Sequence, residues 1–321
     1  MKNIIRIEKL RITEKSKVVT VVFVLILIFA PHLFPGHNTY LLALSLVMAI
    51  FAMSFNLLFR YLGLLSFGQA AYFGTAAYVV VLLYHHLGID SMPILFLTAV
   101  AVATALAASF GYICVKYTEF YFAILTLAIG ELLYFLAIKL KWLTNGTDGL
   151  GITYLPLLWT NTLNTVVYYY LVLIVFLISV LFLWRLTHSP FGLIIQTIRD
   201  NPTRIESIGV KIRRYQWITF IIAGVYAGVA GALVVPLYGH IVPDILRWHV
   251  SGEAIFMCLL GGYTSFLGPI IGALIYTFIK DHLIAELIYW QLVLGIIIVF
   301  FALMFREGIV GLVRRGVRGV P

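Results

Sequence analysis

Charged residues and the usual signatures of catalysis are scarce in this 321-residue sequence. Only 11% of the residues are charged, whereas 62% are hydrophobic, and the mean hydropathy is +1.04. Soluble domains carry about a quarter charged residues, so a chain this apolar would overfill a soluble core. The composition therefore predicts a multi-spanning membrane protein.

The sequence also lacks the motifs of enzymes and metal sites. It has no phosphate loop of the form Gly-x-x-x-x-Gly-Lys-Ser/Thr, no His-Glu-x-x-His and no Cys-x-x-Cys. Cys114 and Cys258 stand in apolar segments without the spacing of metal ligands, as small hydrophobic residues do. We therefore expect no enzymatic activity, no cofactor and no metal. An ATP-driven step would require an ATPase on another chain.

Long unbroken apolar runs are what the chain has instead. A bilayer core accepts helices of roughly 20 apolar residues and requires their backbone groups to be paired internally. The short alternating segments of a membrane β-barrel are not the pattern here. An all-α polytopic fold is predicted, with about eight spanning helices near residues 18–36, 39–60, 63–87, 92–115, 118–139, 164–185, 215–240 and 285–305.

A further apolar stretch, residues 252–280, is interrupted in its middle. Gly261, Gly262, Gly268 and Pro269 stand there, and glycine and proline together loosen or break a helix. We predict two half-length helices that form a re-entrant pair. Two complete short spans would give the same topology.

Basic residues gather in three segments of the chain. Residues 1–17 carry six Lys or Arg against two acidic residues, residues 185–214 six against two, and residues 306–318 four against one. The positive-inside rule places all three in the cytoplasm, together with both termini. The expected organisation is a basic N-terminal segment (1–17), one transmembrane domain (18–305) with a cytoplasmic loop (186–214), and a basic C-terminal tail (306–321).

The loop 186–214 contains the signals of a short helix. Asn201-Pro202 and Thr203-x-x-Glu206, a capping box, are alternative starts, and Gly209 is placed to end the helix. A helix of about two turns is predicted, flanked by Arg199, Lys211, Arg213 and Arg214. Such a helix suits a rigid point through which a separate motor acts. The alternative is a surface loop whose basic residues only anchor it to anionic lipid.

Polar residues within the predicted spans are candidates for a solute path. Glu131 stands midway along its span; it either lines the path or forms a hydrogen bond to a neighbouring helix. Gln69 lies among glycines, where exposed backbone groups can meet a solute. Asn56 and Gln291 are expected to form hydrogen bonds between helices.

Small residues recur at helical spacing in two places. Gly224, Gly228 and Gly231 form one series, and Gly268 and Gly272 form a G-x-x-x-G pair. Faces of this kind let helix backbones approach closely in lipid. Packing within the chain is the favoured interpretation for both, ahead of a contact between two copies.

Several blocks in a fixed order resemble a known family. They are "GLLSFGQAAYFGTAAY" (63–78), "FYFAILTLAIGELLYF" (120–135), "NGTDGLGI" (145–152), the segment 190–233 that contains "RDNPTRIESIGVKIRRYQW", and "GEAIFMCLLGGYTSFLGPIIGALI" (252–275). These blocks resemble the LivM-type inner-membrane permeases of branched-chain amino acid ABC importers. Thr264 departs from the glycine usual at that position, and many members have histidine where this chain has Gln69, so no proton-linked role is assigned to Gln69.

The resemblance implies a type II ABC importer-like assembly in the cell inner membrane. Its partners would be a second related permease, two cytoplasmic ATPase subunits and a periplasmic or lipid-anchored protein that delivers leucine, isoleucine or valine, without nucleic acid.

The candidate residues fall into three groups. Those for coupling to the ATPase are Arg199, Thr203, Arg204, Glu206, Ile208 and Gly209. Those for the translocation path are Gln69, Gly68, Glu131, Gly261 and Gly262. Those for the periplasmic loop are Thr147, Asp148 and Gly149, in a segment that a flexible connector also explains.

Other functions fit parts of this pattern. Related permeases carry urea, short amides or other small solutes. A stand-alone secondary transporter would use Glu131 for proton or sodium coupling and would not need a capped helix in its longest cytoplasmic loop. A membrane protein of assembly or signalling would not need glycine-interrupted helices.

Overall fold

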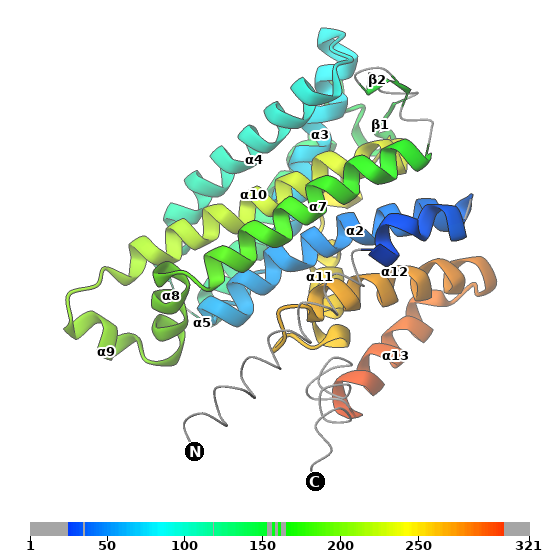
Figure 1. Cartoon of the computed structure of the whole chain (residues 1–321). Coiled ribbons are helices and arrows are strands. Elements are labelled where there is room, and N and C mark those ends of the chain that lie inside the picture. The colour runs from blue at the N-terminus through cyan, green and yellow to red at the C-terminus, as the bar shows by residue number, and fades with distance from the viewer. Residues whose placement is uncertain are drawn as a thin grey trace.

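The computed structural model describes residues 25–34, 36–117, 119–152, 156–157, 160–161 and 165–304, and these are mostly helical (Figure 1). The longer helices are α2 (His37–Asn56), α3 (Gln69–Leu87), α4 (Met92–Cys114), α5 (Glu119–Lys139), α7 (Thr165–Thr187), α8 (Pro190–Asp200), α10 (Ile212–Tyr238), α11 (Trp248–Gly261), α12 (Gly268–Glu286) and α13 (Trp290–Met304). The short elements are the π-helix η1 (Leu57–Leu62), α6 (Lys141–Thr144), the 3-10 turns η2 (Gly146–Asp148) and η3 (Pro243–Leu246), α9 (Pro202–Ser207) and the strands β1 (Leu150–Gly151), β2 (Pro156–Leu157), β3 (Thr160–Asn161) and β4 (His240–Ile241). The predicted all-α polytopic fold is confirmed.

Six of the described helices are long and apolar enough to cross a membrane. They are 37–62, 69–87, 92–114, 120–139, 165–187 and 212–238. Of the first predicted span, 18–36, residues 25–33 are helical and most of the rest lies outside the described residues. The basic segments 1–17 and 306–321 lie outside them too. The total of eight spans stays a prediction.

Two predicted span boundaries are wrong, each for a local reason. The span expected to begin at residue 63 begins at Gln69, because Gly63 takes φ +77° and ends the preceding helix, leaving 63–68 without helix. The span expected from residue 285 begins at Trp290, because α12 continues to Glu286.

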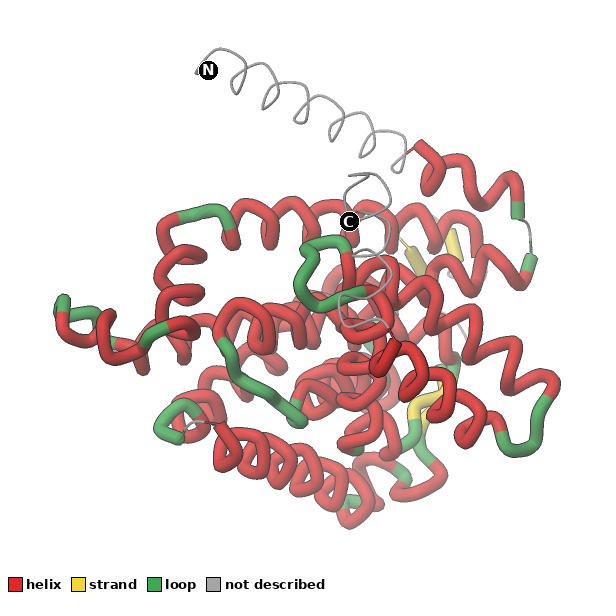
Figure 2. The backbone as a smooth tube through the Cα atoms, turned by 90° about the horizontal axis from the view of Figure 1, so that it is seen from below, coloured by secondary structure: helices red, strands yellow, loops and turns green. Residues whose placement is uncertain are grey.

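Helices α2, α4, α7 and α10 run side by side from one end of the molecule to the other (Figure 1). One end carries α8 and α9, and is called here the hairpin end. The other carries the antiparallel pair of β1 with β4, and is called the sheet end. Figure 2, viewed from below, shows helices on all sides of the core. The most apolar 18 residues of the helix 37–62 are 89% buried and those of α10 72% buried, against 28% in α4. The first two therefore form the core, and α4 leaves its apolar face for lipid or another subunit.

Glycine lets α10 approach its neighbours within this core. A Cβ placed on Gly231 would overlap the backbone carbonyl of Phe73 in α3, and one on Gly228 would lie 2.7 Å from the Cβ of Ala103 in α4. Because lipid provides no hydrophobic drive between helices, close packing of this kind holds the bundle together. The expected packing within the chain is confirmed for this series.

A second glycine contact joins α11 to α12. Cβ atoms placed on Gly261, Gly268 and Gly272 would overlap backbone carbonyls of the facing helix or its turn. The break predicted in the middle of 252–280 is confirmed, with Gly262 at φ +100° in the connecting turn. The ring of Tyr263, in the connecting turn, makes an edge-to-face contact with Phe59 of η1, which lies toward the hairpin end. The chain therefore runs toward the hairpin end along α11 and returns along α12.

Candidate functional sites

Helix α8 begins directly after α7 through a sharp turn at the hairpin end. The Ser189 hydroxyl accepts a hydrogen bond from the Gly192 N–H at 3.3 Å, and Pro190 occupies the first helical position. This is the usual chemistry of a helix start. Ile195 and Ile198 are buried against the bundle, so α8 lies flat across the ends of the long helices.

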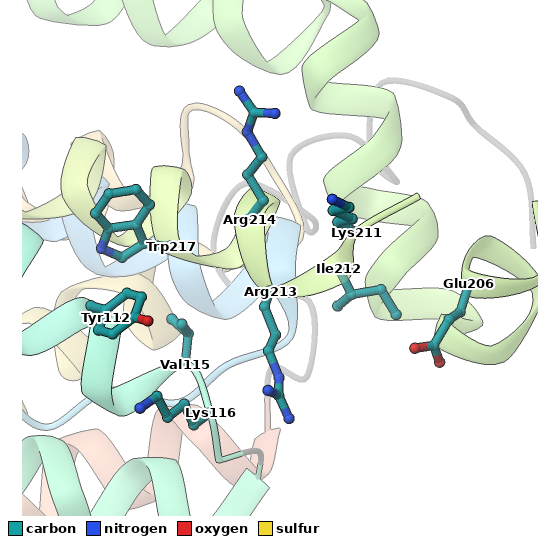
Figure 3. A pocket seen from close by; sticks show the side chains of 9 residues that line it. All are labelled: Tyr112, Val115, Lys116, Glu206, Lys211, Ile212, Arg213, Arg214 and Trp217. Atoms are coloured by element: carbon teal, nitrogen blue, oxygen red, sulfur yellow. The ribbon is translucent and has the colours of Figure 1, made fainter. Parts of the chain in front are cut away.

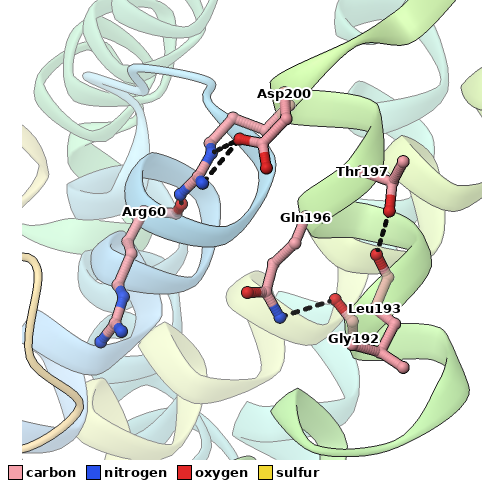
Figure 4. Close-up of polar contacts among 7 residues, drawn as sticks. Arg60, Gly192, Leu193, Gln196, Thr197 and Asp200 are labelled. Atoms are coloured by element: carbon pink, nitrogen blue, oxygen red, sulfur yellow. Dashed lines mark hydrogen bonds and ion pairs between the residues drawn. The ribbon is translucent and has the colours of Figure 1, made fainter. Parts of the chain in front are cut away.

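Arg199 fastens α8 to the bundle. Its guanidinium donates to the backbone carbonyl of Arg60 in η1 and to Asp200 Oδ1, with distances of 2.9 Å from Nε and 2.7 Å from Nη2 (Figure 4). Its aliphatic stem covers Gly63, where an added Cβ would lie 2.6 Å from Arg199 Cγ. Arg199 therefore positions α8 through contacts inside the chain.

Helix α9 follows at once and is capped at both ends. Asn201 Oδ1 accepts from the Arg204 N–H at 3.0 Å, with Pro202 at the first helical position. Of the two predicted starts, Asn201-Pro202 is the observed one, and the Thr203–Glu206 capping box is not. At the other end, the N–H groups of Gly209 and Val210 donate to the carbonyls of Glu206 (3.0 Å) and Ile205 (3.4 Å), a Schellman motif.

The exposed side of α9 carries the predicted coupling residues. Thr203, Arg204, Glu206, Ile208 and Gly209 are all exposed, and Ile208 is 72% exposed. The buried Ile205 holds the helix from below. We call the exposed residues 203–209 the coupling tip: a rigid, capped turn with one apolar side chain among charges.

A groove of about 560 Å³ adjoins the coupling tip. It lies between the end of α4 and the start of α10 and is lined by Tyr112, Val115, Lys116, Glu206, Lys211, Ile212, Arg213, Arg214 and Trp217. Figure 3 shows Glu206 at one edge and the aromatic side chains at the other. Four of these side chains are basic and two are aromatic, so this end of the molecule carries a high density of positive charge.

The predicted path residues Gly68 and Gln69 lie inside the bundle, where α3 begins. Three side chains satisfy the backbone around this helix start: Thr126 Oγ1 accepts from Phe67 N (3.2 Å), Ser66 Oγ from Gly68 N (3.3 Å), and Ser251 Oγ from Ala70 N (2.8 Å). Gln69 is fully buried; its Oε1 accepts from Ser54 Oγ at 2.9 Å, and its Nε2 has no hydrogen-bond partner among the described residues. Irregular backbone at this depth is tolerated only where protein or a cavity surrounds it.

Glu131 meets the start of another helix. Its Oε1 accepts a hydrogen bond from the Trp248 N–H at 3.3 Å, at the first residue of α11. A carboxylate beside a helix N-terminus is favoured by the helix dipole. Of the two roles that the sequence left open, this contact fits the hydrogen bond to a neighbouring helix. The path glycines Gly261 and Gly262 lie apart from it, in the α11–α12 turn.

The loop residues Thr147, Asp148 and Gly149 lie at the sheet end. Gly149 takes φ +71°, and a Cβ there would overlap the carbonyl of Ile241. Histidines hold this loop in place: His240 Nε2 lies 2.7 Å from the Asp148 carbonyl oxygen, and His85 and His86 reach the carbonyls of Gly151 and Leu143. Strand pairing and these contacts make the loop an ordered part of the structure.

Comparison with known protein families identifies the family of this chain. The model of the family described as "Branched-chain amino acid transport system / permease component" matches residues 38–302. The chain belongs to this permease family. Among relatives, the LivM permease of Escherichia coli K12 is 23% identical over 94% of this chain and 76% of the relative. BraD of Pseudomonas aeruginosa is 25% identical over 71% and 78%, respectively. No solved structure gave a match.

A relative named for a different cargo matches a shorter part of the chain. The LsrC protein of Photorhabdus laumondii, named as an autoinducer 2 import permease, is 31% identical, but over only 32% of this chain. With its membrane-spanning helices, the chain is a multi-pass membrane permease.

Two groups in this permease were not singled out from the sequence. Arg60 lies in η1, where its carbonyl receives Arg199. Glu253 of α11 and Lys280 of α12 form an ion pair with Oε1 and Nζ 2.6 Å apart. The sequence did contain a signal for this pair, because the two opposite charges stand at the two ends of the glycine-interrupted stretch 252–280. Only the fold shows that they meet.

Proposed function

We propose that this chain is the permease subunit of an ATP-driven importer for branched-chain amino acids. It forms the translocation path and couples to a separate ATPase through the coupling tip. The observation that carries this proposal is the capped and fastened α8–α9 hairpin, which holds Ile208 out from the bundle at 72% exposure. A surface loop that only anchored to lipid would not need two helix caps and a buried Ile205.

The partners follow from the same architecture. The hairpin end faces the cytoplasm, together with both termini, because basic residues gather there. Two ATPase subunits bind at that end, and a second related permease packs against exposed apolar faces of the outer helices. A substrate-binding protein docks at the sheet end, where Thr147, Asp148 and Gly149 are held in place. Gln69, Gly68, Glu131, Gly261 and Gly262 line or shape the path.

The test replaces the apolar side chain of the coupling tip. Ile208→Asp should leave the chain inserted but lower ATPase recovery on co-purification and substrate-stimulated ATP hydrolysis at least about tenfold, because loss of an apolar anchor costs about 2 kcal/mol or more at a hot spot. The matched control is Ile288→Asp, which alters a 90% exposed isoleucine between α12 and α13.

Normal ATPase recovery and stimulation in Ile208→Asp would remove the coupling assignment. Equal losses in both variants would point to a general effect of a new carboxylate, which would also count against it.

A further inference from the structure

Glu253 and Lys280 form a largely buried charged pair inside the bundle. Their side chains are only 16% and 25% exposed, and they come from facing helices, α11 and α12. The Lys280 ammonium also lies 5.9 Å from the ring centroid of Tyr276 and 5.8 Å from that of Trp290. Ionisable groups at such positions are costly and usually mark a substrate or ion pathway.

Two cavities meet at this pair. One, of about 180 Å³, extends toward His240, Asp244 and His249. The other, of about 260 Å³, extends between α2 and α12 toward Tyr40 and Tyr276. Both are lined by Met48, Tyr238, Glu253 and Lys280. The pair therefore stands where the two cavities adjoin, near the sheet end.

A polar group in the second cavity is left without a partner. Thr277 Oγ1 is buried and makes no hydrogen bond among the described residues, although it sits in the middle of a helix. Other helical threonines of this chain bond back to the preceding turn, as Thr75 does to the Ala71 carbonyl (2.6 Å) and Thr104 to the Val100 carbonyl (2.6 Å). A buried hydroxyl that forgoes this bond is available to a ligand.

The chemistry of these groups selects one kind of small solute. Both cavities are smaller than the pockets of ~300–1,000 Å³ that bind drug-sized molecules, so they suit a smaller ligand. Lys280 offers a cation for a carboxylate, Glu253 offers an anion for an ammonium group, and Met48 with neighbouring apolar side chains offers a surface for a hydrocarbon chain. A zwitterion inserted between Glu253 and Lys280 gives each of them an opposite charge, so neither remains buried without a counter-charge.

We propose that Glu253 and Lys280 form a binding site for a zwitterionic α-amino acid. Lys280 and the Thr277 hydroxyl bind the α-carboxylate, Glu253 binds the α-ammonium group, and the apolar side chain enters one of the cavities. This inference rests on the proposed function and narrows its substrate to amino acids, because urea and short amides carry neither charge.

Direct binding to the assembled transporter tests the site. The full chain, co-purified with its partner permease and ATPase in lipid nanodiscs, would be assayed with radiolabelled L-leucine in the absence of a substrate-binding protein. The competitors are leucinamide, which lacks the carboxylate, and 4-methylpentanoate, which lacks the ammonium group. Both should compete at least about tenfold more weakly than leucine, because each loses one charge-assisted contact.

The two variants should then fail in opposite ways. Lys280→Met should weaken leucine binding at least about tenfold and abolish the preference for leucine over leucinamide, while the preference over 4-methylpentanoate remains. Glu253→Gln should do the reverse. The control is His37→Asn, which removes an exposed contact of 2.9 Å between His37 of α2 and Asp281 of α12, the helix that also carries Lys280. It should leave all three affinities unchanged.

A charge reversal separates recognition from folding. The double variant Glu253→Lys, Lys280→Glu keeps an ion pair, so its melting temperature should stay close to that of the original chain. Leucine binding should nevertheless fall at least about tenfold, because the reversed charges turn the ligand and direct its side chain into the wrong cavity. Full leucine binding in this variant, or equal losses for all three ligands in the single variants, would mean that the pair is only structural.

ATP-driven leucine uptake in proteoliposomes keeps the two proposals apart. Uptake by the original chain combined with unaltered uptake by Lys280→Met and Glu253→Gln would overturn the site and leave the proposed function standing. Failure of the original assembly to move leucine with ATP would overturn the proposed function and the site with it.

Discussion

The molecule contains two helical hairpins that are built in opposite ways. In α8–α9, backbone N–H groups donate hydrogen bonds to Ser189 Oγ and Asn201 Oδ1, and these caps together with the Schellman motif at Gly209 define each helix end within a few residues. In α11–α12, Gly261, Gly268 and Gly272 place two backbones in direct contact. The first hairpin is specified by local capping and stays exposed, whereas the second depends on close contact between the end of α11 and the beginning of α12. The two hairpins therefore use glycine for different reasons. In α8–α9, Gly209 allows a left-handed turn, whereas in α11–α12 the glycines leave out a side chain that would not fit.

The largest expected effect comes from filling the buried contact. Gly272→Ala would drive a methyl group into the Met257 carbonyl, and overpacking of this kind costs about 1–3 kcal/mol or more. The melting temperature of the purified protein should fall markedly. Gly252→Ala is the matched control within α11, where nothing lies within 4 Å of an added Cβ, and it should be neutral or slightly stabilising. Equal melting temperatures for the two variants would contradict the close contact.

A change at Gly209 should instead separate stability from coupling. Its φ is +83°, a value that proline cannot adopt, but an added Cβ would meet nothing within 4 Å. Gly209→Pro should therefore remove the Schellman turn and substrate-stimulated ATPase activity while the bundle keeps its melting temperature. Gly209→Ala, which costs roughly 1–2 kcal/mol for the left-handed conformation, should lose less of this activity. Normal stimulation in Gly209→Pro would show that the geometry of the coupling tip is irrelevant.

The smallest effect tests which residue begins α9. Asn201→Ala should remove the cap and about 1 kcal/mol of local helix stability, which would appear as faster amide hydrogen exchange across residues 203–207. Thr203→Ala should leave the exchange unchanged, because Asn201 Oδ1 already accepts from the Arg204 N–H. Faster exchange in the threonine variant alone would favour the capping box after all.

Local signals explain most of what was predicted correctly. The span positions depend on runs of apolar residues, and the end of α9 depends on Gly209; both are properties of a short window. The candidate residues of the coupling tip share one exposed surface for the same reason. The total number of spans and the roles of the site residues stay predictions.

Contacts between residues far apart in the chain decide three features that a short window of sequence does not show. The span expected from residue 63 begins six residues later, because Thr126 and Ser251 provide hydrogen-bond acceptors for a helix that starts inside the bundle. Glu131 is an isolated carboxylate in the sequence, and only the approach of Trp248 gives it a partner. Arg199 is a surface cation by pattern, yet its guanidinium binds the carbonyl of Arg60.

The sequence alone determined the class of the protein, because 62% hydrophobic residues in long runs leave only a helical membrane protein. It also predicted the short helix α9 and its end at Gly209, since a cap and a left-handed glycine act within one helical turn. Tertiary structure alone decided that Glu253 meets Lys280 and that two cavities adjoin there. The reason is that the two side chains meet only if α11 and α12 lie close together. Three glycines of this hairpin face backbone carbonyl groups across it, and the missing side chains allow that close approach.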